Sequence, residues 1–399
     1  MGESREIKEL LVSRGWQLTE TPDDADLAVL ATCVVIEKTE REMLRRVKVL
    51  SSAPRLIITG CMATACAERA ASIAPEAVFV GPGDLRSFDA AIGDQPARSG
   101  LPLTPDDSYA IVPISSGCVG SCAYCITRLA RGELVSRPVE AIVSRVRDAV
   151  ARGPKEIQLT GQDTASYGAD IGTNLPALVE RVCELGGDFR VRVGMMNPRS
   201  ALMQLDGLAA MYRSPKVFKF LHLPAQSGSD AVLERMGRGY SSADFRNIVS
   251  RLRAEVPTIT LSTDIIVGYP GETDEDHRSN MEILSQVEPD IVNVTRFSPR
   301  PGTVAATEPN QVVGWKAKNR SRELTALRFR IGLKKNQMLI GRSVRALSTE
   351  RGKADSTIFR TDEYKQIVVP LELELGRWSV VRVTRATPTY LIGVLEGPG

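Results

Sequence analysis

The chain has 399 residues, 43% of them hydrophobic and 25% charged, which is typical of a soluble globular protein with two or three domains. Its 51 lysines and arginines against 48 aspartates and glutamates leave a net charge of +3, too small to predict nucleic-acid binding from charge alone. Seven cysteines are too few for a secreted disulfide scaffold, the start lacks a signal-peptide pattern, and no apolar run reaches membrane-spanning length, so we expect a cytoplasmic protein.

The first hundred residues alternate between helical and strand patterns. An apolar helical stripe ends at Gly15, and a charged helix is predicted at 38–50. Short apolar strands are predicted at 26–33, 55–61 and 77–81. This order predicts a small α/β domain with a parallel sheet, although such a domain would normally begin on a strand.

A polar, proline-containing stretch at 98–108 predicts a linker, and six further strand and helix patterns follow it. The six strands are predicted at 110–115, 156–160, 190–195, 218–223, 259–267 and 291–297. Six such units predict an incomplete parallel barrel, in which functional residues follow the carboxyl ends of the strands. Polar or glycine-containing clusters follow all six: they begin at Cys118, Gly161, Asn197, Gln226, Gly268 and Ser298.

The last segment contains five short β patterns with polar turns, which predict a small five-stranded barrel. They lie at 343–348, 356–360, 366–370, 378–384 and 390–395.

Three cysteines with C-x3-C-x2-C spacing, Cys118, Cys122 and Cys125, are the most informative motif. Three thiolates on one loop can bind three irons of a [4Fe-4S] cube, which leaves the fourth iron open to a substrate or cofactor. Zinc would need a fourth nearby ligand, and the two histidines, His222 and His277, are distant in sequence. Three is an odd number for a disulfide framework. The remaining alternative is that these are buried small residues.

This loop, with Tyr124 before its last cysteine, resembles that of the radical S-adenosylmethionine (SAM) superfamily. The resemblance implies that the three cysteines hold the cluster and that its open iron binds the amino and carboxylate groups of SAM. One electron would then cleave SAM to a 5′-deoxyadenosyl radical, while the protein positions the reacting atoms.

Longer segments resemble the methylthiotransferases of that superfamily: PISSGCVGSCAYCITRLARGELVSRP, LTGQDTASYGADIGTNLP, LHLPAQSGSDAVLERMGRGY and STDIIVGYPGET. The resemblance implies an N-terminal methylthiotransferase domain at 1–97, a radical SAM barrel with a trailing basic helix at 109–335 and a TRAM-like β-barrel at 336–399. YGADIGTNLP and VRVGMMNP are similar to the archaeal and eukaryotic branch. That branch adds a 2-methylthio group to N6-threonylcarbamoyladenosine at position 37 of tRNA.

In the family, three cysteines of the N-terminal domain hold a second, auxiliary [4Fe-4S] cluster. Cys33 and Cys61 match two of them, and no cysteine matches the first, because Met1 already stands at the start of the helix that usually follows it. We expect a missing strand and cysteine before Met1 rather than an incomplete auxiliary site, since the sheet would otherwise keep an open edge. Cys66 and Cys183 are expected in the core.

Family position implies further contacts, each with the alternative of an ordinary strand-end or turn residue. Gln162 and Asp163 would contact the SAM amino group or the substrate. Ser262 and Asp264 follow the pattern that touches the SAM ribose, where a carboxylate can accept two hydroxyl hydrogen bonds.

Other positions on the barrel follow the same argument. Gln226 and Arg137 would contact the methionine part of SAM. Gly268 and the pair 270–271 would let backbone approach the adenine closely. His222 is expected to be a buried barrel residue and not a ligand.

The stretch 315–336 holds eight lysines and arginines against one acid, Glu323. The usual interpretation is a helix with a solvated charged face. Here it leads into a small barrel of a kind that binds RNA, so we expect contacts to the tRNA anticodon stem-loop. The resemblance further implies an electron donor such as flavodoxin or ferredoxin, no membrane contact and a monomer.

Two other functions stay open. The same radical chemistry would serve for a ribosomal protein or another modified adenosine, although VRVGMMNP argues against this. A non-catalytic RNA-binding protein with a degenerate cluster domain would explain the missing cysteine. The intact cysteine motif opposes that alternative, because a binding module needs no oxygen-sensitive cofactor.

Overall fold

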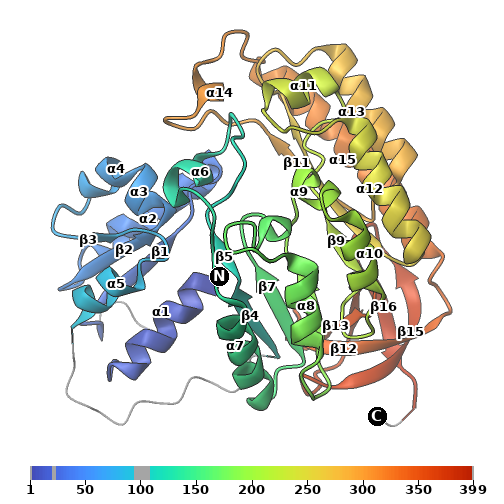
Figure 1. The fold of residues 1–399 in the computed structure, drawn as a ribbon, viewed down its shortest axis with the longest axis horizontal. Coiled ribbons are helices and arrows are strands. Elements are labelled where there is room, and N and C mark those ends of the chain that lie inside the picture. Colours follow the sequence, from blue (N-terminus) through green and yellow to red (C-terminus); the bar gives the residue numbers. More distant parts are fainter. Residues whose placement is uncertain (1, 20–23, 94–107, 398–399) are drawn as a thin grey trace. The chain divides into compact units, whose positions relative to one another are not determined.

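The computed structural model describes residues 2–19, 24–93 and 108–397 (Figure 1). The chain forms two compact units: residues 1–105, 116–135 and 298–308 make the first, and residues 106–115, 136–297 and 309–399 the second. The cysteine motif therefore packs with the N-terminal residues, whereas the sequence-based domain boundaries follow chain order. The predicted linker lies outside the described residues, apart from Ser108.

The first unit contains the predicted parallel sheet, in the order β1-β2-β3. Its strands are β1 (Ala28–Thr32), β2 (Leu56–Gly60) and β3 (Val78–Val80). The central strand β2 is buried along its whole length, which explains its continuous apolar run. The helices of this unit are α1 (Gly2–Ser13), α2 (Glu37–Leu50), α3 (Cys61–Ala65), α4 (Ala67–Ala71), α5 (Leu85–Ile92), α6 (Ile126–Arg131) and α14 (Val304–Thr307).

The second unit contains the six predicted barrel strands, all in parallel register within two three-stranded sheets. One sheet has the order β4 (Tyr109–Pro113), β7 (Glu156–Thr160), β8 (Arg190–Val193), and the other β9 (Phe220–His222), β10 (Thr260–Val267), β11 (Ile291–Arg296). A single bridge between Val191 and Val217 links them. The prediction of an incomplete parallel barrel is confirmed.

Helices cover this barrel, and its core is one large cluster of aliphatic and aromatic side chains. The helices are α7 (Val139–Ala151), α8 (Leu175–Cys183), α9 (Pro198–Leu202), α10 (Leu205–Arg213), α11 (Asp230–Arg235), α12 (Ser242–Glu255), α13 (Asp274–Val287) and α15 (Gly314–Gln337). Two-residue strands β5 (Ser115–Ser116) and β6 (Val135–Ser136) flank the cysteine loop. No helix within the described ranges is both long and apolar enough to cross a bilayer.

The C-terminal segment forms the predicted closed five-stranded barrel, drawn in red in Figure 1. Its strands are β12 (Ser343–Arg351), β13 (Thr357–Thr361), β14 (Gln366–Val369), β15 (Trp378–Ala386) and β16 (Leu391–Leu395), in the order β12-β13-β14-β16-β15. It docks on the larger barrel through Tyr364, in the turn between β13 and β14. The Tyr364 ring lies 5.0 Å from the rings of Phe218 and Phe220, and its hydroxyl donates to Glu156 Oε1 at 2.6 Å.

Candidate functional site

The three cysteines of the motif lie on one short turn before α6. Gly117 has φ +74° and lies against the Glu133 carbonyl, so a side chain would not fit there. The Gly120 amide donates to Cys118 Sγ at 3.2 Å, and the Cys125 amide donates to the Cys122 carbonyl at 3.1 Å. Cys125 is the N-cap of α6. Backbone hydrogen bonds within the loop, and from the Cys118 amide to the Gly132 carbonyl, thus hold the three cysteines on one turn.

Three thiolates are a donor set that suits a [4Fe-4S] cube, whereas zinc would need a fourth ligand. All three thiols are partly exposed, and burial raises the pKa of the Cys125 thiol. No three metal-ligating side chains of the described ranges converge on one ion. In a cube each thiolate binds a different iron, so the ligands stand apart and need not meet at a point.

The cysteines of the N-terminal domain lie near one another and near α6. Cys61, the first residue of α3, is buried, whereas Cys33, just after β1, is exposed. Burial raises the pKa of the Cys61 thiol, against the opposing effect of Arg131, which hydrogen-bonds to it. Arg131, the last residue of α6, also forms an ion pair with Glu3 at 2.6 Å. One short helix thus connects the cysteine loop to Cys61.

A buried ion-pair cluster attaches the segment after β11 to the same unit. Glu40 is 1% exposed and pairs with Arg300 and Arg69. Arg300 also hydrogen-bonds to Cys66, which lies in the core of this unit as expected. Further along, the Ala305 amide donates to the Ala123 carbonyl at 2.9 Å. The segment therefore contacts both the N-terminal domain and the cysteine loop.

Side chains from three neighbouring barrel strands meet at Asp264. His222 Nε2 on β9 lies 3.1 Å from Asp264 Oδ2, and Asn293 Nδ2 on β11 donates to Asp264 Oδ1 at 2.7 Å. Asp264 and Asn293 are register partners in the parallel sheet. His222 is partly exposed, not buried as predicted, because its edge faces this polar cluster. Ser262 is buried two residues earlier on β10.

The loop after β7 carries two polar side chains, of which one is buried and hydrogen-bonded and the other has a buried carbonyl oxygen without a hydrogen-bond partner among the described residues. Asp163 is 1% exposed and accepts from the Asn197 amide at 2.9 Å and from Ser200 Oγ at 2.6 Å. It therefore ties this loop to the one after β8, and burial raises its pKa. Gln162 Oε1 is buried without a hydrogen-bond partner among the described residues. Buried acceptors are normally paired, so this oxygen fits a donor on a bound ligand.

Gln226 and Arg137 lie in different surroundings. Gln226 has φ +64°, an uncommon conformation for a residue other than glycine, and such strain concentrates at functional sites. The Gln226 amide donates to the Asp264 carbonyl at 2.8 Å, and this hydrogen bond holds the residue in place. Arg137 lines a cavity whose other walls come from β4 and α7. The contact of Arg137 to SAM stays a prediction, as do those of the other barrel residues.

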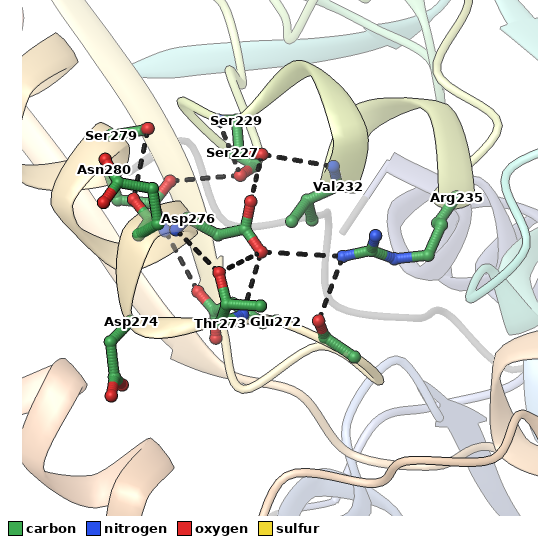
Figure 2. A network of polar contacts seen from close by, with 12 residues as sticks. Ser227, Ser229, Val232, Arg235, Glu272, Thr273, Asp274, Asp276, Ser279 and Asn280 are labelled. Carbon is green, nitrogen blue, oxygen red and sulfur yellow. Dashed lines mark hydrogen bonds and ion pairs between the residues drawn. The ribbon is translucent and has the colours of Figure 1, made fainter.

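A buried polar network, which the sequence did not reveal, fixes the loops after β9 and β10 (Figure 2). Asn280 Oδ1, on α13, accepts from the Gly228 amide at 2.6 Å and from Ser227 Oγ at 3.1 Å. Its Nδ2 donates to Glu272 Oε1 at 3.1 Å, and Glu272 Oε2 accepts from the Gly268 amide. The network thus joins the backbone beside Gln226 to the glycine-containing loop after β10.

Arg320 of α15 completes this network. Its guanidinium lies 2.9 Å from Glu272 Oε2 and 2.6 Å from Asp274 Oδ1. The side chain of Glu272 has no exposed surface, and burial raises its pKa against the opposing effect of Arg320. A buried carboxylate of this kind is tolerated only when it is paired and hydrogen-bonded.

Family comparisons agree with this architecture. Residues 112–284 match the family described as the Radical SAM superfamily, residues 1–81 the Uncharacterized protein family UPF0004 and residues 337–395 the TRAM domain. A "Probable threonylcarbamoyladenosine tRNA methylthiotransferase" of Pyrococcus horikoshii is 40% identical, covering 96% of this chain and 94% of that protein. The chain belongs to the threonylcarbamoyladenosine tRNA methylthiotransferase family. A member of this family from Xenopus laevis is 33% identical over 96% of the chain and 72% of its own length.

A solved structure shares the fold of this methylthiotransferase. The radical SAM methyltransferase TsrM of Kitasatospora setae superposes with a TM-score of 0.55 at 16% identity, over 72% of this chain and 67% of that one. The predicted resemblance, the enzyme class and the fold are therefore confirmed. The individual ligands of the clusters and of SAM remain predictions.

Proposed function

We propose that this radical SAM methylthiotransferase adds a 2-methylthio group to N6-threonylcarbamoyladenosine at position 37 of tRNA. The observation that carries the proposal is the turn that presents Cys118, Cys122 and Cys125 together. These three thiolates would hold a [4Fe-4S] cluster and leave one iron to SAM. When bound, the cluster and SAM supply one-electron cleavage of SAM and removal of a hydrogen atom from an unactivated carbon.

The chain's own residues would bind SAM and the substrate and hold them in position. Gln162 Oε1 would accept a hydrogen bond from the SAM amino group or the substrate, because it has no partner within the described residues. Asp264, held by His222 and Asn293, would present a fixed carboxylate edge to a ribose. Gln226, Ser262 and the loop beginning at Gly268 would complete the SAM contacts.

Cys33 and Cys61 would be two of the ligands of the auxiliary cluster. Arg131 would set the position of Cys61 through its hydrogen bond to the thiol. The further parts of the proposal are a flavodoxin or ferredoxin as electron donor, a monomeric state and a cytoplasmic location.

The test is anaerobic reconstitution followed by iron and sulfide analysis and mass spectrometry of tRNA nucleosides. With SAM, dithionite and tRNA bearing N6-threonylcarbamoyladenosine, we expect 5′-deoxyadenosine and the 2-methylthio nucleoside. Cleavage of SAM with an unchanged nucleoside would reject the substrate but keep the radical chemistry. Fewer than four irons per chain would reject the radical chemistry itself.

A further inference from the structure

Seven of the eight basic residues of α15 divide into two sets, and the eighth, Lys316, lies with its ammonium 5.8 Å from the Trp315 ring centroid. Four of them make hydrogen bonds or ion pairs inside the second unit: Arg320 with Glu272 and Asp274, Arg328 with the Val292 carbonyl, Lys334 with Glu288, and Lys335 with Asp290. Arg320, Arg328 and Lys335 of this set lie beside the buried apolar residues of the helix, whereas Lys334 pairs with Glu288 at the surface. The set provides a structural anchor and offers little charge to a partner.

The other side of the helix carries exposed cations interleaved with exposed aromatic rings. Lys318, Arg322 and Arg330 are exposed, and no ion pair or hydrogen bond joins them to any described residue. Trp315 is 63% exposed and Phe329 38% exposed. At about 100° per residue these five positions fall on one face of the helix. We call them the α15 stripe.

The stripe has the dimensions and chemistry of a track for a nucleic-acid strand. From Trp315 to Phe329 it runs about 21 Å along the helix axis. Glu323 beside it hydrogen-bonds to His277 Nε2 at 2.8 Å, and three cations against this one carboxylate leave the stripe positive. Cations attract phosphates, and exposed aromatic rings stack on unpaired bases.

We propose that the α15 stripe binds the RNA strand of the tRNA substrate, with phosphates on Lys318, Arg322 and Arg330 and unpaired bases on Trp315 and Phe329. The identity of the RNA rests on the proposed function. An acidic electron-donor protein is the competing occupant. A protein interface buries about 800 Å² on each partner around a packed centre, whereas the stripe is a narrow line of charges and separated rings.

The test uses an anticodon stem-loop bearing N6-threonylcarbamoyladenosine, with binding measured by fluorescence anisotropy over a range of salt concentrations. Loss of two phosphate contacts in Lys318→Gln/Arg322→Gln is expected to flatten the slope of log affinity against log salt by about 1.4–1.8. Trp315→Ala/Phe329→Ala is expected to weaken binding about fivefold or more with an unchanged slope. Lys334→Gln, which removes an exposed charge outside the stripe, is the control and should bind like the wild type.

Several outcomes decide the proposal. Wild-type affinity and slope in both double variants would overturn it. Lys318→Gln/Arg322→Gln could instead bind RNA like the wild type and accept electrons from flavodoxin more slowly. That result would overturn the proposal and favour an acidic protein as the occupant of the stripe. Cleavage of SAM with dithionite alone should be unchanged in every variant, which separates this result from misfolding. If wild-type enzyme leaves the nucleoside unmodified but binds RNA through the stripe, the proposed function fails and this inference survives.

Discussion

At the scale of single residues, the three cysteines of the motif differ from the other cysteines in their surroundings. Cys118, Cys122 and Cys125 share one turn, whereas Cys183 on α8 packs beside the barrel core and contacts Ser214. Thiolate ligands of a cluster are not replaceable by hydroxyl groups without large losses, because a serine is a poor ligand for iron.

Cys125→Ser therefore should lower the iron bound to the reconstituted protein and abolish most 5′-deoxyadenosine formation. Cys183→Ser is the matched control and should keep both the bound iron and the formation of 5′-deoxyadenosine. Iron analysis, electron paramagnetic resonance and product quantification check the result. Full iron content with normal SAM cleavage in Cys125→Ser would remove this residue from the ligand set.

The sequence predicted functional residues that lie close together in the chain. It did not predict residues whose hydrogen-bond partners are far away in the sequence. The cysteine spacing is contained in eight residues, so its meaning was visible in the sequence. Asn280 was not predicted, because its partners Gly228 and Glu272 lie 52 and 8 residues away. Asn293 had a usable signal: it lies on a predicted strand, in register with Asp264.

At the scale of elements, long apolar patterns predicted the strands well, and helices of four to six residues left no periodic signal. The sequence also placed the cysteine loop with the barrel, while packing groups it with the N-terminal residues. That grouping depends on Arg131–Glu3 and Arg300–Glu40, ion pairs between residues 128 and 260 positions apart, which no local pattern encodes.

The network of Figure 2 permits an exchange of donor and acceptor between Glu272 and Asn280. Asn280→Asp would set two buried carboxylates against each other, and Glu272→Gln would leave Arg320 with one ion-pair partner. Each single change should lower the free energy of unfolding by about 2–4 kcal/mol and raise the KM for SAM. In the double variant Glu272→Gln/Asn280→Asp, the new amide at position 272 can donate to the new carboxylate at position 280. Stability and KM should therefore recover in part, because the pair between Glu272 and Arg320 stays lost.

Urea unfolding and SAM-dependent kinetics of the four proteins form a double-mutant cycle. Glu282→Gln, an exposed change on the same helix α13, is the control. Additive losses in the double variant would show that Glu272 and Asn280 do not act as a pair. Recovered stability with an unrecovered KM would show that the network does not position the loops that we propose to contact SAM.

At the scale of the whole chain, the small β-barrel is part of the second compact unit and not a tethered module. Asp290, 4% exposed, pairs with Lys335 of α15 at 2.7 Å and with Lys365 of the small barrel at 2.6 Å. The two ammonium groups hold the pKa of Asp290 below its usual range despite burial. Tyr364 makes the second connection through Glu156. Two sets of buried polar contacts therefore hold the small barrel against the larger one.

Glu156 makes this docking dependent on pH. It is 1% exposed, and burial raises its pKa in spite of the hydrogen bonds from Tyr364 and Gln158. A carboxyl group whose folded pKa is raised contributes most below its unfolded pKa of about 4.3, and the contribution is lost as pH rises through the folded pKa. Glu156→Gln stays neutral and keeps an acceptor for Tyr364. It should therefore gain thermal stability over the wild type as pH rises from 5 to 8.

Thermal unfolding of the two proteins at several pH values measures this difference. Tyr364→Phe is the matched control, because it removes the hydroxyl that donates to Glu156. It should be less stable than the wild type, and the loss of stability should be larger at pH 8 than at pH 5. A difference between Glu156→Gln and the wild type that does not change with pH would mean that the Glu156 carboxyl has the same pKa in the folded and unfolded chain. Burial at the junction of the two barrels would then not control its protonation, and the docking would be insensitive to pH.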